Sequence, residues 1–240
     1  ALGILDEDPF AAAIYTNANA KTVLESILGG HFDLELSGDL QSEKLTGYIA
    51  DCTRREALQQ VAFALRAVVD TSGSGNVKVW RLPENDPAEI PMNRLYTGGD
   101  VSTSAIVTEV RVTAHTYSTS GSGSDTVEVG GKTYHHTTAV TTKSNPNVTA
   151  STKPNVIEVK DATLVNASNV AAVTQHVFDY YMRRQTHGVK IVMDKEMPGD
   201  YVTTTTPWED QITGTITSMT IKLSGIAAAD CEIVGTGAST

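Results

Sequence analysis

The 240-residue sequence contains only two cysteines, and they lie far apart. Cys52 and Cys231 show no C-x-x-C spacing, which excludes the usual sequence patterns of a zinc site and of a redox pair. We therefore expect both thiols to be buried in a protein that folds in a reducing compartment.

Long apolar runs are also missing. The longest uncharged ones, such as residues 226–229, are far shorter than the ~20 residues that a membrane-spanning helix needs. The sequence opens without Met and without the basic and apolar regions of a signal peptide. We expect no membrane span, and we expect the chain to be a fragment of a longer protein.

Positive charge is scarce. The sequence has 18 basic and 28 acidic residues, a net charge of −10, and its only adjacent basic pairs are Arg54-Arg55 and Arg183-Arg184. Such a surface repels a phosphate backbone, so we expect no specific nucleic-acid binding. An acidic surface does suit a path along which DNA slides without sticking.

The common catalytic motifs are absent from the sequence: it has no G-x-S-x-G, no H-E-x-x-H and no G-x-x-x-x-G-K-[ST]. The acidic run of Asp6, Glu7 and Asp8 could offer oxygen ligands to a hard cation. A run of this kind before a proline is more often a solvated turn, which is the interpretation we favour.

The histidines do not form a recognisable pattern. His135 and His136 are adjacent on a predicted strand, so their side chains point to opposite faces and cannot share a metal without a bulge. The other four have no carboxylate or cysteine at a ligand spacing: His31, His115, His176 and His187. We predict no catalytic, cofactor-binding or metal-ligating residue, no cofactor, and no enzymatic activity. A site assembled from distant residues stays open.

Residues 1–85 have the pattern of a small α/β module, in the order strand, helix, strand, strand, helix, strand. The clearest element is CTRREALQQVAFALRAVV, residues 52–69, where Thr53 and Glu56 have the spacing of a capping box. Apolar residues, Leu65 among them, recur at helical spacing on one face, and none of them can ionise. We predict a helix that serves as a brace, with both helices covering one face of a small sheet.

Three prolines in RLPENDPAEIP, residues 81–91, indicate a linker, and we place a domain boundary between Leu82 and Met92. Residues 86–240 are rich in short alternating runs of Thr and Val, which predict strands, and Gly130-Gly131 predicts a two-residue hairpin. One helix is predicted at about residues 168–187. The expected fold class is α+β, with a small βαββαβ module followed by a β-rich barrel or sandwich domain.

The second half carries a family resemblance. The order VAAVTQHVFDYYMRRQTHGVKIVM, then MPGDYVTTTTPWEDQITGTITSMTIKLSGIAAADCEIVG, resembles the closing region of tail-tip and baseplate hub proteins from phages and prophages of Gram-positive bacteria. The matching positions are Tyr180-Tyr181 and residues 198–202, 214–219 and 231–235. In the first half, YTNANAKTVLESILGG is similar to the small α/β module of the same proteins.

This resemblance implies a structural protein of the virion tail. Such proteins form rings, commonly trimers, that join the tail tube to the host-contacting parts. The implied partners are further copies of the chain and other tail proteins. The implied location is the virion tail, with the host cytoplasm during assembly.

Two alternatives stay open. The segments AKTVLESIL and TRREALQQVAFAL also resemble the N-terminal interaction modules of secretins and TonB-dependent receptors, although that leaves residues 86–240 unexplained. A tail-associated peptidoglycan hydrolase is the other alternative, and it would need an acidic or Cys/His cluster that converges in space.

Overall fold

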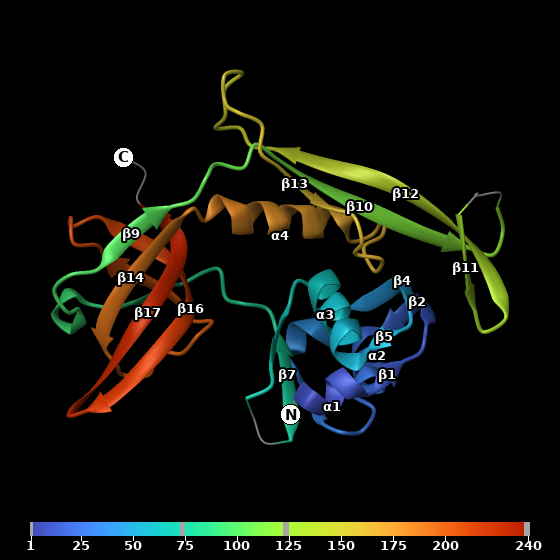
Figure 1. Ribbon diagram of the computed structural model, residues 1–240, viewed down its shortest axis with the longest axis horizontal. Coiled ribbons are helices and arrows are strands. Elements are labelled where there is room, and N and C mark those ends of the chain that lie inside the picture. Colours follow the sequence, from blue (N-terminus) through green and yellow to red (C-terminus); the bar gives the residue numbers. More distant parts are fainter. Residues whose placement is uncertain (1, 73–74, 122–124, 238–240) are drawn as a thin grey trace. The chain divides into compact units, whose positions relative to one another are not determined.

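The computed structural model describes residues 2–72, 75–121 and 125–237 and shows an α+β chain (Figure 1). The chain folds into two compact units. Unit 1 comprises Ala1–Arg81 and Thr108–Phe178, and unit 2 comprises Leu82–Val107 and Asp179–Thr240. From the linker we expected two consecutive domains. Each unit is instead built from two separate segments, because the chain leaves unit 1 after Arg81 and returns to it at Thr108.

Residues 108–178 belong to unit 1 because a segment of this stretch crosses strand β4 (Lys44–Ile49). The backbone N–H of Tyr48 donates to the Thr163 carbonyl at 3.3 Å, and the Thr163 hydroxyl donates to the Tyr48 carbonyl. Gly47 permits this approach, since a Cβ there would lie 2.4 Å from the Thr163 oxygen. These contacts join residues that are distant in sequence, which is why linker composition did not reveal them.

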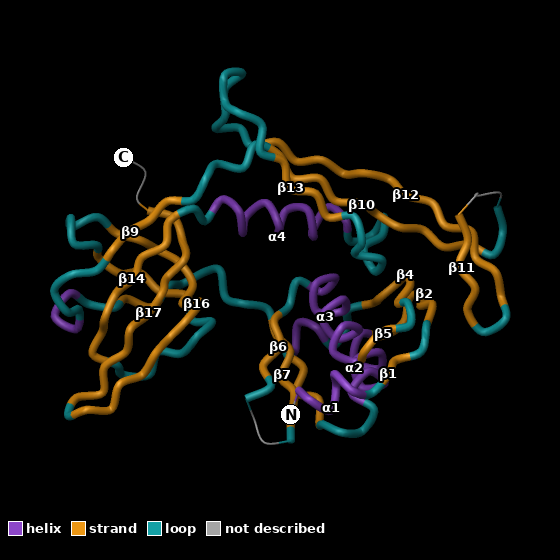
Figure 2. Tube along the Cα trace, in the orientation of Figure 1, coloured by secondary structure: helices purple, strands orange, loops and turns teal. Residues whose placement is uncertain are grey.

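Residues 1–81 form the small α/β module of unit 1 (Figure 2). Its helices and strands are α1 (Leu2–Glu7), β1 (Pro9–Phe10), β2 (Ala13–Asn19), α2 (Ala20–Leu28), β3 (Asp33–Leu36), β4, β5 (Cys52–Thr53), α3 (Arg54–Leu65), β6 (Val68–Asp70) and β7 (Asn76–Trp80). The strands pair as β1-β5, β2-β4 and β3-β7-β6. The expected single sheet is therefore divided, because the crossing segment bonds to β4 at Tyr48.

Helix α3 begins with the predicted capping box. The Thr53 hydroxyl accepts from the Glu56 N–H, and the Glu56 carboxylate accepts from the Thr53 N–H at 2.8 Å. Leu65 is 3% exposed within the core of the module, so the helix does pack as a brace. It ends earlier than the pattern predicted, because Arg66 has a φ of 58° and β-branched Val68 pairs with Trp80 in a strand.

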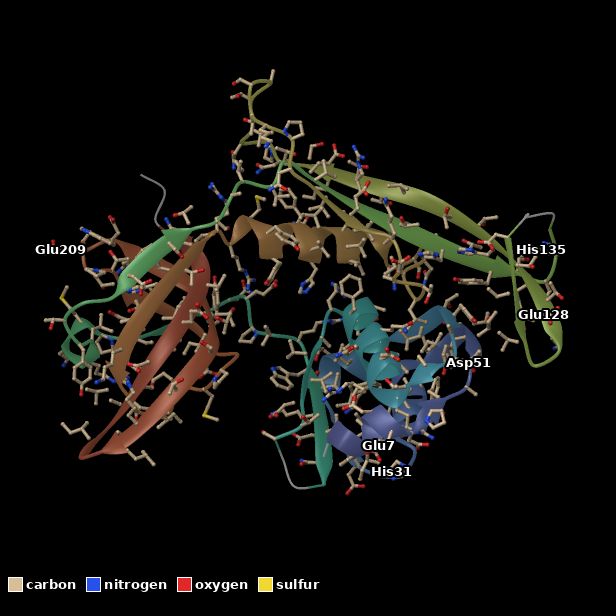
Figure 3. The ribbon with its side chains drawn as sticks, in the orientation of Figure 1. Glu7, His31, Asp51, Glu128, His135 and Glu209 are labelled. Atoms are coloured by element: carbon tan, nitrogen blue, oxygen red, sulfur yellow. The ribbon has the colours of Figure 1, made fainter. Side chains whose placement is uncertain are left out.

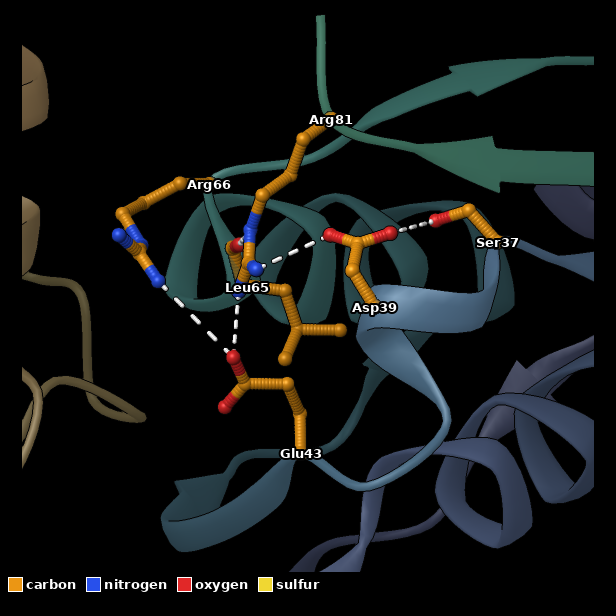
Figure 4. A network of polar contacts seen from close by, with 6 residues as sticks. All are labelled: Ser37, Asp39, Glu43, Leu65, Arg66 and Arg81. Carbon is orange, nitrogen blue, oxygen red and sulfur yellow. Dashed lines mark hydrogen bonds and ion pairs between the residues drawn. The ribbon is translucent and has the colours of Figure 1, made fainter.

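Arg81 fixes the point at which the chain leaves the module (Figure 4). Its guanidinium donates to the Leu65 carbonyl at 3.1 Å, to Asp39 at 3.0 Å and to Glu43 at 2.5 Å. The Ser37 hydroxyl also donates to Asp39, at 2.6 Å, and this bond is the main reason that the pKa of Asp39 is lowered. One side chain thus holds the end of α3 against the loop between β3 and β4.

The second part of unit 1 is a four-stranded sheet in the order β11-β12-β10-β13. Its strands are β10 (Glu109–Ser118), β11 (Asp125–Val129), β12 (Lys132–Ser144) and β13 (Val156–Val159). The β11–β12 turn is the predicted one, with positive φ at Gly130 and Gly131. The part of helix α4 (Val170–Met182) that belongs to unit 1 runs along this sheet (Figure 1). Lys143 of β12 lies over the ring of Phe178 of α4, with its Nζ 5.0 Å from the ring centroid.

Unit 2 is one curled, six-stranded sheet in the order β8-β15-β16-β17-β14-β9. Its strands are β8 (Ala88–Glu89), β9 (Asp100–Thr103), β14 (Gln185–Val192), β15 (Tyr201–Thr205), β16 (Gln211–Ser224) and β17 (Ile226–Gly237). The core is aliphatic, with Ile191, Ile212 and Ile233 fully or almost fully buried. The β-rich half of the sequence thus supplies two sheets that belong to different units, rather than one barrel or sandwich domain.

The predicted helix at about residues 168–187 is too long at both ends, since α4 covers Val170–Met182. Residues 185–192 form strand β14, so His187, at the end of the predicted helix, is a strand residue. Arg183 and Arg184, between α4 and β14, each bind a different group. Arg183 pairs with Glu84, and Arg184 donates to the Ser104 carbonyl at 2.9 Å.

Two glycines bring β16 and β17 unusually close together. Gly214 and Gly235 are register partners. A Cβ on Gly235 would lie 2.0 Å from the Thr213 carbonyl oxygen, and a Cβ on Gly214 would lie 2.3 Å from that of Val234. No side chain fits at either position, so these glycines set the separation of the two central strands.

Candidate functional site

The acidic run at the N-terminus is bonded to helix α3 and to His31. Asp8 accepts from Arg54 at 2.5 Å and lies 3.2 Å from His31, and Asp6 pairs with Arg55 at 3.1 Å. The hydrogen bond from Arg54, followed by that of His31, lowers the pKa of Asp8. These carboxylates join α1 and the residue after it to the start of α3.

Arg54 also closes the end of the neighbouring helix. Its Nη1 donates to the carbonyls of Ser26 and Ile27 at 2.9 and 2.8 Å, which are among the carbonyls that helix α2 leaves unpaired at its C-terminus. Gly29 permits the approach, because a Cβ there would lie 2.8 Å from the guanidinium. Together with the Asp8 pair, this makes Arg54 a structural residue.

His135 and His136 lie on β12, at the hairpin with β11 (Figure 3). Adjacent strand residues face opposite sides, so these two do not share a ligand site. His136 instead contacts His115 of β10, with 2.9 Å between its Nε2 and the Nδ1 of His115. Its other nitrogen lies 2.8 Å from Asp125 of β11. Three strands thus meet at one imidazole pair.

The chain of hydrogen bonds through the two histidines reaches the backbone at Lys160. His115 Nε2 lies 2.8 Å from the Lys160 carbonyl oxygen, and Tyr117 stacks on His136 with ring centroids 4.7 Å apart. Burial raises the pKa of Tyr117 to about 12, so its phenol is neutral at physiological pH. The cluster of Asp125, His136, His115 and Tyr117 is the main polar constellation that the sequence analysis missed.

The hydrogen atoms of this cluster can be counted from its bonds. The Lys160 carbonyl and the Asp125 carboxylate only accept, so each takes an N–H from the histidine beside it. The bond between His115 and His136 needs one more hydrogen, so all bonds form together only when the pair carries one positive charge. Burial lowers the pKa of His115.

This arrangement links strands β10, β11 and β12 through side-chain contacts. The bonded chain ends on a backbone carbonyl, which neither gives nor takes a proton, and no nucleophilic side chain takes part in it. Across residues 2–72, 75–121 and 125–237, no three His, Cys, Asp or Glu side chains form a group that could hold a metal ion.

His187 is a different case. It is 0% exposed in the sheet of unit 2, and within the described structure neither ring nitrogen has a hydrogen-bond partner. It lines a cavity of about 350 Å³ together with side chains of unit 2 such as Leu95, Tyr96 and Thr205. Burial lowers the pKa of His187, against the opposing charge of Asp100.

The thiols are not reactive. Cys231 is buried, and burial raises its pKa to about 11. Cys52 is half-buried rather than fully buried as we expected, and burial also raises its pKa. A thiolate is the nucleophilic form, so neither residue is activated for chemistry at neutral pH.

The partner of His136 could have been found from the sequence. A two-residue turn at Gly130-Gly131 fixes the register of its hairpin, and that register places Asp125 opposite His136. The contact with His115 could not have been found in this way, since the register of β10 against β12 depends on a longer loop that carries no turn signal.

The comparisons with known proteins concern the fold. No protein-family model matches the chain, and no curated protein matches it in sequence. Within the described residues, every helix is too short or too polar to cross a membrane.

Solved structures do resemble the chain. A tail protein from Neisseria meningitidis MC58 matches 97% of the chain and 71% of its own length, with a TM-score of 0.65 and 11% identity. The 43 kDa tail protein of prophage MuSo2 from Shewanella oneidensis matches 98% of the chain and 71% of its own length, with a TM-score of 0.61 and 9% identity. Prophage tail protein gp18 from Listeria monocytogenes EGD-e matches 95% of the chain and 68% of its own length, with a TM-score of 0.55 and 14% identity. The chain therefore shares the fold of these tail proteins.

Proposed function

We propose that this chain is a structural component of a phage or prophage tail. The observation that carries the proposal is the likeness to tail proteins over almost the whole chain, at 97% coverage and a TM-score of 0.65. Because the identity is 11%, the likeness concerns the fold, and the role is our inference from it.

Within the tail we assign it to the tip or baseplate hub, as a ring that joins the tail tube to the host-contacting parts. The motif order around Tyr180-Tyr181 and residues 198–202 supports this position and favours a Gram-positive host. A trimer is the stoichiometry that the resemblance implies. The partners are then further copies of the chain and other tail proteins, first in the host cytoplasm and then in the virion.

The internal chemistry agrees with a structural role without catalysis. The His115–His136 pair ends on a carbonyl, the acidic run is bonded to arginines, and the pKa of the Cys231 thiol is raised to about 11. With a net charge of −10, the surface suits a tail through which DNA passes without specific binding.

Mass photometry of the intact parent protein tests the ring. We expect one discrete multimer that stops growing with concentration, as closed symmetry requires. A ladder of ever larger species would contradict a closed ring. The neighbouring reading frames give an independent test: tail-tube, tape-measure and lysis genes support the proposal, whereas secretion genes support the secretin-type alternative.

A further inference from the structure

Two long sheet edges in the chain are open, and they are the starting point of this inference. Strand β11 covers β12 only along residues 132–136, and β10 covers the opposite side. Among the described residues, 137–144 of β12 therefore have no partner strand on the side of β11. Strand β15 covers β16 only along residues 211–215, so residues 218–224 also have one unpaired side, with β17 on the other.

The backbone groups that face each opening follow from the register. Asn145 N–H donates to the Thr108 carbonyl, and the N–H of His115 on β10 donates away from β12, to the Val165 carbonyl, so the odd-numbered residues of β12 are the ones that bond to β10. Bonded and open positions alternate along a strand. The residues that direct N–H and C=O groups to the open side of β12 are therefore Thr138, Val140, Thr142 and Ser144.

The backbone groups on the open side of β16 also follow from its register with β17. Met193 N–H donates to the Ala227 carbonyl, so odd-numbered residues of β17 face β14 and even-numbered ones face β16. The even-numbered residues of β16 opposite them are then bonded to β17. Its open side presents the backbone of Met219, Ile221 and Leu223.

The open edges contain no proline and no acidic residue, although each carries one lysine, Lys143 on β12 and Lys222 on β16, and a bulge between Ile216 and Ser218 precedes the open part of β16. Natural edges are shortened, bulged, or supplied with proline and charge. Residues 137–144 read TTAVTTKS, without proline, glycine or acid, and their register with β10 is unbroken. The other outer strands of the four-stranded sheet differ: β13 spans four residues, and β11 carries Asp125 and Glu128.

Aliphatic side chains are exposed along both open edges. Val140 is 62% exposed on β12, and Ile221 and Leu223 are 46% and 82% exposed on β16. A strand laid against either edge would cover such side chains as well as satisfy the backbone groups. Cross-strand aliphatic pairs stabilise sheets, so the two edges complement each other in backbone and in side chains.

We propose that residues 137–144 of one copy pair as a β-strand with residues 218–224 of a second copy. The two surfaces are different, so a pair of copies keeps one free β12 edge and one free β16 edge, to which further copies can add. A head-to-tail interface of this kind closes into a ring when the rotation between copies permits it. The inference rests on the proposed ring and names the surfaces that form it.

Edge-blocking variants test the pairing. Val140→Lys and Ile221→Lys place a charge on each edge at an exposed side chain, so folding should be unaffected. We expect each variant, made in the intact parent protein, to weaken association about tenfold or more, with the monomer replacing the multimer in mass photometry. Thr133→Lys is the matched control, because it adds the same charge on β12 where β11 covers the edge, and it should leave the multimer intact.

Disulfide trapping gives the direction of pairing. One chain carries a single cysteine on β12 and a second chain carries one on β16, chosen from three positions on each edge: Thr138, Val140, Thr142 and Met219, Ile221, Leu223. Mixing should give a cross-linked dimer in at least one combination. Each single variant alone should give none, since like edges do not meet.

The outcomes separate this inference from the proposed function. Multimers that survive both Val140→Lys and Ile221→Lys overturn the edge pairing and leave the ring intact. A β12 cysteine that cross-links to its own kind, a disulfide within one chain, or a wild-type protein that stays monomeric up to its solubility limit also overturns it. Placement of the protein in the tail is measured independently, by electron microscopy.

Discussion

The two units bury their polar groups in different ways. In unit 1, His115 is 5% exposed and both of its ring nitrogens have partners, and Arg81 is bonded by three groups. In unit 2, His187 is 0% exposed and neither nitrogen has a partner in the described structure, while the central strands touch through glycines. Unit 1 is thus held by bonded side chains and helix faces, whereas close backbone packing dominates in unit 2.

The largest expected effect lies in the glycine contact of unit 2. Gly235→Ala places a Cβ 2.0 Å from the Thr213 carbonyl oxygen, which β16 and β17 can relieve only by separating. We expect a loss of more than about 4 kcal/mol in the free energy of unfolding, measured by denaturant titration. Gly38→Ala is the control, because nothing lies within 4 Å of its added Cβ. Equal stability of both variants would contradict the close-packing account.

Leu65→Ala tests the helix-built core of unit 1. Leu65 is 3% exposed on the buried face of α3, and its truncation leaves a cavity. We expect a destabilisation of about 2 to 5 kcal/mol in urea unfolding. Gln59→Ala, on the exposed face of the same helix, should change stability by less than about 0.5 kcal/mol. A similarly small effect at Leu65 would mean that the helix is not a brace.

Glu196 forms a buried ion pair with Arg94 in unit 2. Burial alone would raise its pKa, but the hydrogen bonds from Arg94 and from the Asp194 N–H lower it to about 2. A pKa below the unfolded value stabilises the fold above about pH 4.5, and that stability is lost as the pH falls towards 2.

We therefore expect Glu196→Gln to cost about 2 to 3 kcal/mol at pH 7 and to flatten the loss of stability between pH 4.5 and pH 2. Unfolding titrations of wild type and variant across this range measure both effects. If the two proteins lose stability in parallel, the Arg94 pair does not lower the pKa of Glu196 in the folded state.

The two buried histidines give the smallest and sharpest comparison. His115→Leu removes the hydrogen bonds that His115 makes with the Lys160 carbonyl and with His136. We therefore expect the free energy of unfolding to fall by about 1 to 3 kcal/mol at pH 7. His187→Leu removes a polar group that has no partner, so we expect a neutral or slightly stabilising effect. Thermal unfolding of both variants measures the difference, and the reverse order would contradict the contrast between the units.

The pH dependence follows from the same two groups. Burial lowers the pKa of both His115 and His187, so the unfolded chain binds protons first as the pH falls. Neither group costs stability through protonation above the ordinary histidine pKa of about 6.5, and the free energy of unfolding declines as the pH falls below it. His187→Leu should reduce the loss of stability between pH 7 and pH 5, and an unchanged slope would mean that His187 does not contribute to it.

Local patterns predicted local structure well. The Thr53 capping box, the buried face of α3 and the Gly130-Gly131 hairpin all follow from spacings of a few residues, which act before the rest of the chain folds. The sequence pattern wrongly extended the helix to Val68 and Val69. Apolar periodicity does continue past Leu65, but Arg66 adopts a left-handed conformation and strand β6 follows.

Long-range features were not predictable in the same way. The crossing of β4 by Thr163 depends on a glycine at position 47 that carries no signal until its neighbour is known. The burial of His187 depends on β14 starting three residues after α4, whereas helical spacing appeared to continue. The return of the chain to unit 1 follows from such contacts, which join residues more than a hundred positions apart.

The central claim is that this chain is a structural part of a phage tail, and electron microscopy of labelled particles tests it most directly. Gold-labelled Fab fragments against the chain would be added to tailed particles induced from the source organism. We predict label at the tail end that carries the tip, and none on the head. Label confined to the head, or particles that contain none of the protein, would contradict the account.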